Sequence, residues 1–463
     1  MNPPPLPRRP ASVFVKLASI GGLILLLHVP LLLTHGVLIE RQGYQRQAVA
    51  EIASRWGGDQ LVTGPILAVP YAYKTTVIRP KVVAGKVVQV EETEFAAATA
   101  YFLPEVLAVG GAIETEIRHR GIYDAAVYGT TLQLSGSFQP DFAAAGIGAD
   151  RIDWDKACVL VGVSDLHGVR SVSPLRIAGR RTTAFESADN TTGDLLPLAA
   201  RIEGAAAGAR LEFAFEVAVQ GSQQLQIAPA GNVTKVTLRS PWPDPSFGGA
   251  YLPAKRQVTP EGFQADWEIS HFSRGFPQSW TTQANRDDEM MRKIAAASFG
   301  VTFAQPVDGY RLSERAEKYG LLFFVLIFAV FFLFEMTSAL RIHPLQYGLV
   351  GAGLCLFFLG FLALSEVLAP GLAYGAAAAA CTELVALYAW SFLRTGRRTL
   401  IVIGGLAATY GYLYFVLQSQ DFALLAGTAA LFVALGLVMF VTRRFNWYTL
   451  ETDPAAGDAA SRA

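Results

Sequence analysis

The chain has 463 residues, of which 52% are hydrophobic and 16% are charged, and its formal net charge is +0. Soluble domains average about 25% charged residues, so this chain is depleted in charge. The neutral total removes the electrostatic reason to expect nucleic acid as a partner, because nucleic-acid binding needs an excess of basic residues. The depletion is uneven: residues 40–318 carry most of the acids and bases, and both ends of the chain are apolar.

The apolar ends contain segments long enough to cross a bilayer, which takes roughly 20 mostly apolar residues. The first segment, 17–39, could be a cleaved signal peptide. Its apolar run is longer than that of an ordinary signal, and no small-x-small cleavage site follows it, so we interpret it as an uncleaved anchor. Five further segments are predicted to span the membrane, at about 320–340, 345–365, 372–393, 399–417 and 422–442.

Basic residues in the short loops predict the orientation, because loops rich in Lys and Arg stay in the cytoplasm. Loops 365–371 and 418–421 contain neither Lys nor Arg. We therefore predict that both termini are cytoplasmic and that residues 40–318 lie on the other side of the membrane. The basic residues that agree with this orientation are Arg8, Arg9, Lys16, Arg341, Arg394, Arg397, Arg398, Arg443 and Arg444.

Residues 40–318 are expected to form mostly β-structure. Segments 112–121, 211–220 and 263–270 alternate apolar and polar residues, which indicates strands with one buried and one solvated face. Amphipathic helices are predicted at 44–56 and within 283–298. The expected fold is a β-sandwich-like domain, either as one unit or as two subdomains that meet near 190–205.

This external region offers no convincing catalytic or metal site. "SDLHG" places Ser164, Asp165 and His167 close together, but a working triad is usually built from distant positions, so a turn is the favoured interpretation. "HFSR" (271–274) fails in the same way. The six histidines show no H-E-x-x-H spacing. The three cysteines, Cys158, Cys355 and Cys381, suggest small buried residues, so no metal, cofactor or enzymatic activity is predicted.

Glu383 and Tyr410 lie near the middle of two predicted spans, at similar depths, and Tyr410 could donate to the carboxyl group. An ionisable residue inside a span is costly and is a functional candidate by default. One interpretation places Glu383 on a proton or ion path. The other makes it a neutral acid that locks two helices by a hydrogen bond worth about 1 kcal/mol. The second is favoured, because no second acidic or basic group lies at the same depth.

A second group of polar residues lies in "EMTSALRIHPLQYG" (335–348), between two apolar runs. We interpret this stretch as a cytoplasmic turn between two spans. Arg341 and His343 fix it on the positive side, and Pro344 stands near the start of the next helix, where its missing amide hydrogen is tolerated. Glu335 is close enough to be paired with those cations.

Several stretches together resemble the CreD family of bacterial inner-membrane proteins. The motif is carried by Glu335, by "RIHPLQY", which includes Gln346 and Tyr347, and by Ser365-Glu366. Val367 follows Glu366 where the family pattern has His, so no role of that histidine is carried over. The other matching stretches are "GPILAVPY", "RHRGIYDAAVY", "SPWPDPSFGGAYLP", "HFSRGFPQSW" and "LQSQDFALLAGTAALFVALGLVMFVTRR".

The resemblance implies a first span, a large periplasmic domain and a multi-span C-terminal region. It also implies expression under a sensor-kinase system and effects on envelope stress and colicin tolerance, without a known chemical reaction. The resulting layout is a cytoplasmic N-terminus (1–16), a transmembrane helix (17–39), a periplasmic β-rich domain (40–318), a five-helix transmembrane region (319–442) and a cytoplasmic tail (443–463).

The leading hypothesis is a non-enzymatic inner-membrane protein that maintains or senses the cell envelope. Its periplasmic domain would bind an envelope protein or cell-wall component, and its helices would contact membrane lipids. Glu335, Arg341, His343 and Gln346 are the candidate relay residues. The alternative is a small-molecule or lipid transporter that uses Glu383 and Tyr410, and an intramembrane enzyme is a weaker third hypothesis. The sequence leaves the oligomeric state open.

Overall fold

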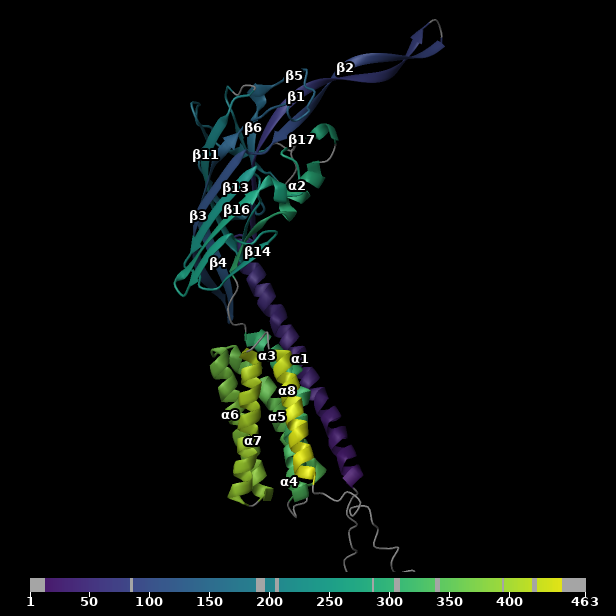
Figure 1. Ribbon diagram of the computed structural model, residues 1–463, viewed down its shortest axis with the longest axis vertical. Helices are drawn as coiled ribbons and strands as arrows, with labels where there is room; N and C mark the ends of the chain where they lie inside the picture. Colours follow the sequence, from purple (N-terminus) through teal and green to yellow (C-terminus); the bar gives the residue numbers. More distant parts are fainter. Residues whose placement is uncertain are drawn as a thin grey trace, which may run out of the picture. The chain divides into compact units, whose positions relative to one another are not determined.

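The chain forms two compact units, Met1–Tyr44 with Val307–Ala463 and Gln45–Pro306. We name them the helical unit and the sheet unit and describe each by itself (Figure 1). The computed structural model describes residues 13–83, 86–188, 196–204, 208–284, 287–303, 309–337, 342–393, 395–418 and 423–443.

The first sheet of the sheet unit has ten strands, and seven of them follow the order β14-β18-β12-β1-β6-β10-β9. β2 pairs with β1 and β17, and β5 pairs with β1. Most pairs are antiparallel, but β1 and β12 are parallel. The strands are β1 (Gln60–Val83), β2 (Lys86–Phe102), β5 (Arg151–Ile152), β6 (Cys158–Val163), β9 (Glu186–Ser187), β10 (Leu198–Arg201), β12 (Gln224–Ile227), β14 (Pro245–Gly249), β17 (Ser279–Thr281) and β18 (Phe299–Phe303).

The second sheet has eight strands, in the order β15-β16-β13-β3-β4-β11-β7, with β8 beside β11. Two of its strands confirm the predicted alternation: in β11 and β16 the apolar residues are buried and the polar ones are more exposed. The strands are β3 (Val106–Arg120), β4 (Tyr123–Phe138), β7 (Val169–Val172), β8 (Arg176–Ile177), β11 (Leu211–Ser222), β13 (Val233–Ser240), β15 (Lys255–Thr259) and β16 (Gly262–Ser270).

One hydrophobic core joins the inner faces of the two sheets. Val69 of β1 and Phe102 of β2 belong to the same buried cluster as Leu132 of β4, Val217 of β11 and Leu238 of β13. The helix α2 (Asp287–Ala296) packs on this core through Met290, Met291 and Ile294 and confirms the helix predicted within 283–298. Sheet packing around a shared core agrees with the predicted β-sandwich-like arrangement.

β1 and β2 form a long hairpin that projects from the first sheet (Figure 1). Beyond Ala72 no other described strand pairs with β1, and before Ala100 none but β1 pairs with β2. Side-chain ion pairs connect the two strands instead, between Arg79 and Glu94 at 2.6 Å and between Lys81 and Glu92 at 3.5 Å. This part of the hairpin is therefore a free two-stranded ribbon.

Both helical segments predicted near the N-terminus, 17–39 and 44–56, belong to one helix of 44 residues, α1 (Val13–Trp56). Side-chain hydrogen bonds from Tyr44 to Glu40 and from Gln47 to Glu51 support the helix where the two predicted segments join. The remaining helices are α3 (Gly309–Lys318), α4 (Gly320–Thr337), α5 (Pro344–Ser365), α6 (Pro370–Leu393), α7 (Gly396–Gln418) and α8 (Ala423–Thr442).

The number of spans differs from the prediction. Among the described residues, four helices rather than six are long and apolar enough to cross a membrane, Val15–Trp56, Pro344–Ser365, Pro370–Ser391 and Gly396–Gln418. Within α4, the residues described in full, Gly320–Phe332, form an apolar helix that is shorter than the length required of a candidate span. The last predicted segment is helical as α8 but does not reach the required length over the residues described in full.

Candidate functional site

Glu335, near the end of α4, is the centre of a polar junction inside the helical unit. Its carboxylate forms an ion pair with Lys16 of α1 and accepts a hydrogen bond from the Ile342 amide at 3.1 Å. The Tyr347 hydroxyl of α5 donates to its other oxygen at 3.3 Å. One nearly buried carboxylate thus connects three helices, and every partner stabilises its charged form.

His343 and Gln346 shape the start of α5. The His343 ring accepts a hydrogen bond from the Leu345 amide at 3.2 Å, and the Gln346 side chain accepts one from the His343 amide at 2.9 Å. These bonds form a capping box around Pro344, the first helical residue. The two side chains therefore satisfy backbone groups that a helix start leaves without partners.

The expected partners of Glu335 need correction. His343 does not contact the carboxylate, because its ring caps the helix, and Arg341 lies outside the described residues. The cation is Lys16, which precedes the first span and is 319 positions away along the chain. The basic residue before that span was visible in the sequence, but nothing in the spacing indicated that it meets Glu335.

Two further carboxylates tie α1 to other helices of the same unit. His35 lies 3.0 Å from Glu317 of α3, and Arg41 lies 3.6 Å from Glu366 at the end of α5. The Tyr310 hydroxyl also donates to Glu366 at 3.0 Å. Burial raises the pKa of Glu317. The residue pattern did not predict these ties, although Glu366 belongs to the motif that resembles the family.

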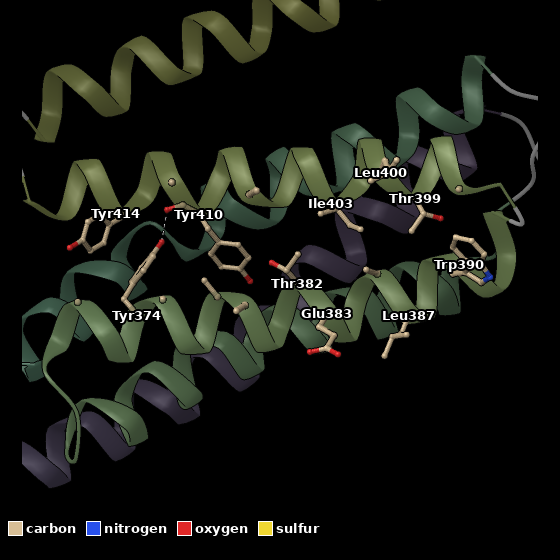
Figure 2. Close-up of a pocket in the computed structure, with 18 residues that line it drawn as sticks. Tyr374, Thr382, Glu383, Leu387, Trp390, Thr399, Leu400, Ile403, Tyr410 and Tyr414 are labelled. Carbon is tan, nitrogen blue, oxygen red and sulfur yellow. Dashed lines mark hydrogen bonds between the residues drawn. The ribbon is translucent and has the colours of Figure 1, made fainter.

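A groove of about 980 Å³ runs between α6 and α7 (Figure 2). Small residues line much of it, and its surface is almost entirely apolar. Glu383 is the only acidic or basic residue of the lining. The lining includes Gly371, Gly375, Ala378, Ala379, Thr382, Ala386, Leu387 and Trp390 of α6 and Thr399, Ile403, Ala407, Tyr410, Gly411 and Tyr414 of α7.

The expected hydrogen bond between Tyr410 and Glu383 is absent. The Tyr410 hydroxyl is buried beside Cys381 rather than Glu383, while its ring packs against Phe323 and Phe357. The Glu383 side chain is exposed and points away from α7 (Figure 2). The hydrogen bond at this position runs from the Tyr374 hydroxyl to the Tyr410 carbonyl at 2.7 Å. Similar depth did not ensure that the two side chains face each other.

The open face of the eight-stranded sheet carries a polar groove, the sheet groove. A hollow of about 760 Å³ adjoins one of about 470 Å³, and Arg239 of β13 and Glu114 of β3 line both. Neither side chain forms a hydrogen bond or ion pair within the described chain. Gly110, Ala112 and Thr131 form part of the floor, and a methyl group on Gly110 would touch nothing within 4 Å. A larger side chain would therefore fit at position 110, so steric crowding does not explain why the groove is open there.

"SDLHG" forms a structural turn. Asp165 caps a 3-10 turn (Leu166–Gly168) by accepting a hydrogen bond from the His167 amide, and it accepts another from the Gly58 amide at 2.8 Å. The Gly58 bond is the main reason that the pKa of Asp165 is lowered. Ser164 donates to the Asp59 carbonyl instead of to His167. The serine, histidine and aspartate thus form no catalytic relay.

The "HFSRGFPQSW" stretch braces loops of the sheet unit. Arg274 is buried and donates to the carbonyls of Pro229 at 3.1 Å and Ala230 at 2.8 Å, and it also bonds the Gln278 side chain. Gln278 donates onward to the carbonyl of Pro104. Burial lowers the pKa of Arg274 to about 10. This motif serves the fold, because it satisfies carbonyl groups that would otherwise be buried without partners.

The described residues contain no group of three or more His, Cys, Asp or Glu that could hold a metal ion. All three cysteines are free. Cys355 and Cys381 are buried, and Cys158 is half-buried in β6, where burial raises its pKa to about 11. A thiol with a raised pKa is a poor nucleophile at neutral pH.

Comparison with known proteins places these features in a family. A crystallised M1 zinc metallopeptidase from Deinococcus radiodurans is 8% identical, covers 36% of this chain and 38% of its own, and superposes with a TM-score of 0.18, too low to support an argument. The inner membrane protein CreD of Escherichia coli (strain K12) is 33% identical over 444 residues, which are 95% of this chain and 95% of that protein. The family profile "Inner membrane protein CreD" matches residues 12–448. The chain therefore belongs to the CreD family of inner membrane proteins.

Proposed function

We propose that this protein is a non-enzymatic inner-membrane protein that supports the integrity and stress response of the cell envelope by binding one of its components. The helical unit anchors the chain, and the sheet unit lies in the periplasm with both termini in the cytoplasm. Membership of the CreD family supports the location in the inner membrane. The basic residues of the short loops support the proposed orientation.

The sheet groove is the observation that carries the binding proposal. Arg239 and Glu114 are exposed in it without partners, and Gln133 and Thr131 add hydrogen-bonding groups. The centres of protein–protein interfaces are enriched in aromatic side chains, and the lining of the wider hollow contains none. The groove instead suits a polar ligand that presents a carboxylate to Arg239 and an ammonium or other donor to Glu114.

The dimensions of the sheet groove favour an extended ligand. Its lining reaches from β15 to Arg170 in β7, across the seven strands of the main path of the sheet. At about 4.8 Å between strands the path is about 29 Å long, enough for about eight residues of extended chain. We infer a linear polar chain of the cell envelope as the ligand class.

A photoreactive residue at Gln133 tests the binding proposal in living cells. It should crosslink to envelope material, whereas the same residue at Lys235, on the same face but paired with Glu268 outside the groove, should not. Arg239→Ala and Glu114→Ala should each lower the Gln133 yield about tenfold, the size of one lost charge-assisted hydrogen bond. Failure to recover envelope material at Gln133 would refute binding in the groove.

Labelling of single cysteines tests the orientation. An impermeant thiol reagent should react from outside the inner membrane with Ser419→Cys and only from the cytoplasm with Arg397→Cys. The reverse pattern would overturn the proposed topology.

Transport through the helical unit receives less support. The groove between α6 and α7 supplies one carboxylate, which points away from α7, and no second acidic or basic group for a relay (Figure 2). Its apolar lining suits a hydrophobic occupant better than a hydrated ion.

A further inference from the structure

Two ionisable side chains, one basic and one acidic, lie exposed in the middle of the apolar helices. His28 of α1 and Glu383 of α6 are both exposed, and neither forms a hydrogen bond or ion pair with any other described residue. In a bilayer, ionisable side chains within spans normally face the bundle interior or pair with one another, because hydrocarbon solvates them poorly. These two residues depart from that rule within a single copy of the chain.

His28 and Glu383 lie at the same depth, because their neighbours contact the same turn of α5. The Cys355 thiol donates to the carbonyl of Leu27, which precedes His28, at 3.8 Å. The Cys381 thiol, two residues before Glu383, donates to the carbonyl of Gly353 at 3.1 Å. One helical turn rises about 5.4 Å, so the two side chains differ in depth by about one turn at most.

The two side chains cannot meet within one copy. A methyl group on Gly351 of α5 would collide with Leu27, whereas a methyl group on Gly353 would touch Val385 of α6. Two residues along a helix correspond to a rotation of about 200°, so α1 and α6 pack on opposite faces of α5. Figure 1 shows the two helices at opposite edges of the helical unit, with α5 between them.

We propose that His28 of one copy pairs with Glu383 of a second copy of this chain, with α1 of the first copy seated along α6 of the other, at the rim of the groove between α6 and α7. Equal depth makes the two edges complementary when copies are related by rotation about the membrane normal, because an imidazole and a carboxyl group can hydrogen-bond each other. Such a contact is heterologous, since it joins two different surfaces, and repeating it can close a ring.

The shapes of the two surfaces fit this contact. On the side of α1 that carries His28, large side chains are exposed, with Leu25 73% exposed and Leu32 56% exposed. The facing groove holds about 980 Å³ and is lined by small residues such as Gly375, Ala379 and Ala386. Large side chains against small ones allow helices to pack closely in lipid, where packing and hydrogen bonds drive association.

Disulfide trapping tests the contact directly. In the full-length chain with its three native cysteines replaced by Ala, His28→Cys and Glu383→Cys are introduced together and the membranes are oxidised. We expect linked dimers and higher multiples, because each copy carries both halves of the contact. Either cysteine alone, or His28→Cys with Leu400→Cys, should give no ladder. The proposal is wrong if the His28–Glu383 pair crosslinks no better than these controls.

Energy transfer between copies carrying donor or acceptor fluorescent proteins at the C-terminus tests the charges without removing cysteines. His28→Leu and Glu383→Leu should each weaken association in vesicles about three- to thirtyfold, and the exchange His28→Glu with Glu383→His should restore it. Both positions are exposed, so the folded helices should persist, which circular dichroism checks. Energy transfer that is unchanged in both single variants would overturn the pairing, even if the sheet groove binds its ligand as proposed.

Discussion

Buried carboxylates of the helical unit are tied to distant partners, whereas two charged residues of the sheet groove, on the open face of the second sheet, are left free. Glu335 is bound by Lys16 and Tyr347, and Glu317 lies against His35. In the sheet groove, Arg239 and Glu114 have no partner within the described chain. Desolvation explains the difference. A charge in a low-dielectric helix bundle must be compensated by neighbouring groups, whereas an exposed charge is solvated by water and needs no protein partner.

The comparison separates structural from functional charges. Removing a tied charge strands its partner and destabilises the fold, whereas removing a free charge leaves stability nearly unchanged and affects only what the protein binds. The sequence does not make this distinction, because a tied charge, Glu335, and a free one, Glu114, both lie in segments that stood out there. Stability measurements on matched pairs of variants can test it.

The largest effect is expected for Glu335→Ala, which leaves Lys16 without its ion pair. Because Lys16 is partly exposed, we expect a loss of about 2–3 kcal/mol of unfolding free energy, below the full cost of a stranded buried charge. Denaturant unfolding in detergent, followed by circular dichroism, measures it. Glu383→Ala is the control and should change little. Equal losses would abolish the distinction between tied and free carboxylates.

A comparable loss, about 2 kcal/mol, is expected for Arg274→Ala in the sheet unit, because two loop carbonyls and Gln278 lose their donor. Arg239→Ala is the matched control, an arginine of the same unit that is exposed and unpaired, and it should stay within about 0.5 kcal/mol of wild type. Tryptophan fluorescence during urea unfolding of the full chain reports both. A larger loss for Arg239→Ala would show that the groove arginine serves the fold.

A smaller effect, about 1 kcal/mol, is expected when the capping box at the start of α5 is removed by His343→Ala. His343→Asn keeps a capping acceptor and should recover most of the loss. If both variants match wild type in thermal unfolding while the envelope response changes, His343 has a role beyond the cap. Glu335→Gln with a normal envelope response would likewise remove the idea that this junction is a switch.

The smallest effect concerns pH and Asp165. Its pKa is lowered in the folded protein, so the folded state binds fewer protons than the unfolded state around that pKa. Its contribution, about 0.5 kcal/mol once solvent screening of this partly exposed carboxylate is counted, is therefore present above the unfolded pKa and is lost as pH falls through the lowered folded value. Asp165→Asn should unfold more easily at pH 7 and match wild type near pH 2. Asp155→Asn, at an exposed and unpaired residue, should show no such convergence.

The strands were predictable from local pattern, but their partners were not. Alternation in 211–220 and 263–270 identified β11 and β16 because burial repeats every second residue. The parallel pairing of β13 with β3 joins segments more than a hundred positions apart, and no local signal encodes it. The sheet groove was missed for the same reason, since Arg239 and Glu114 become neighbours only through that register.

The helical sites were predictable in part. The high free-energy cost of ionisable groups in the membrane singled out Glu335 and Glu383 as candidates, and the family motif added Tyr347, whose hydroxyl donates a hydrogen bond to Glu335. The predicted hydrogen bond between Glu383 and Tyr410 was wrong, because similar depth in the membrane does not fix which side of its helix a residue occupies. The Tyr410 ring faces Phe323 and Phe357. Lys16 was noted for topology alone, since its contact with Glu335 depends on how α1 packs.

The free part of the β1–β2 hairpin also bears on how the protein behaves at high concentration. A ribbon with two open edges offers backbone donors and acceptors to any other strand, and such edges seed aggregation unless they are protected. Here Pro80 removes one amide donor, and Arg79, Lys81, Glu92 and Glu94 place charges along both strands. Pro80 and these charged residues thus protect the hairpin edges against intermolecular β-pairing. They should be kept when a soluble form of the sheet unit is engineered.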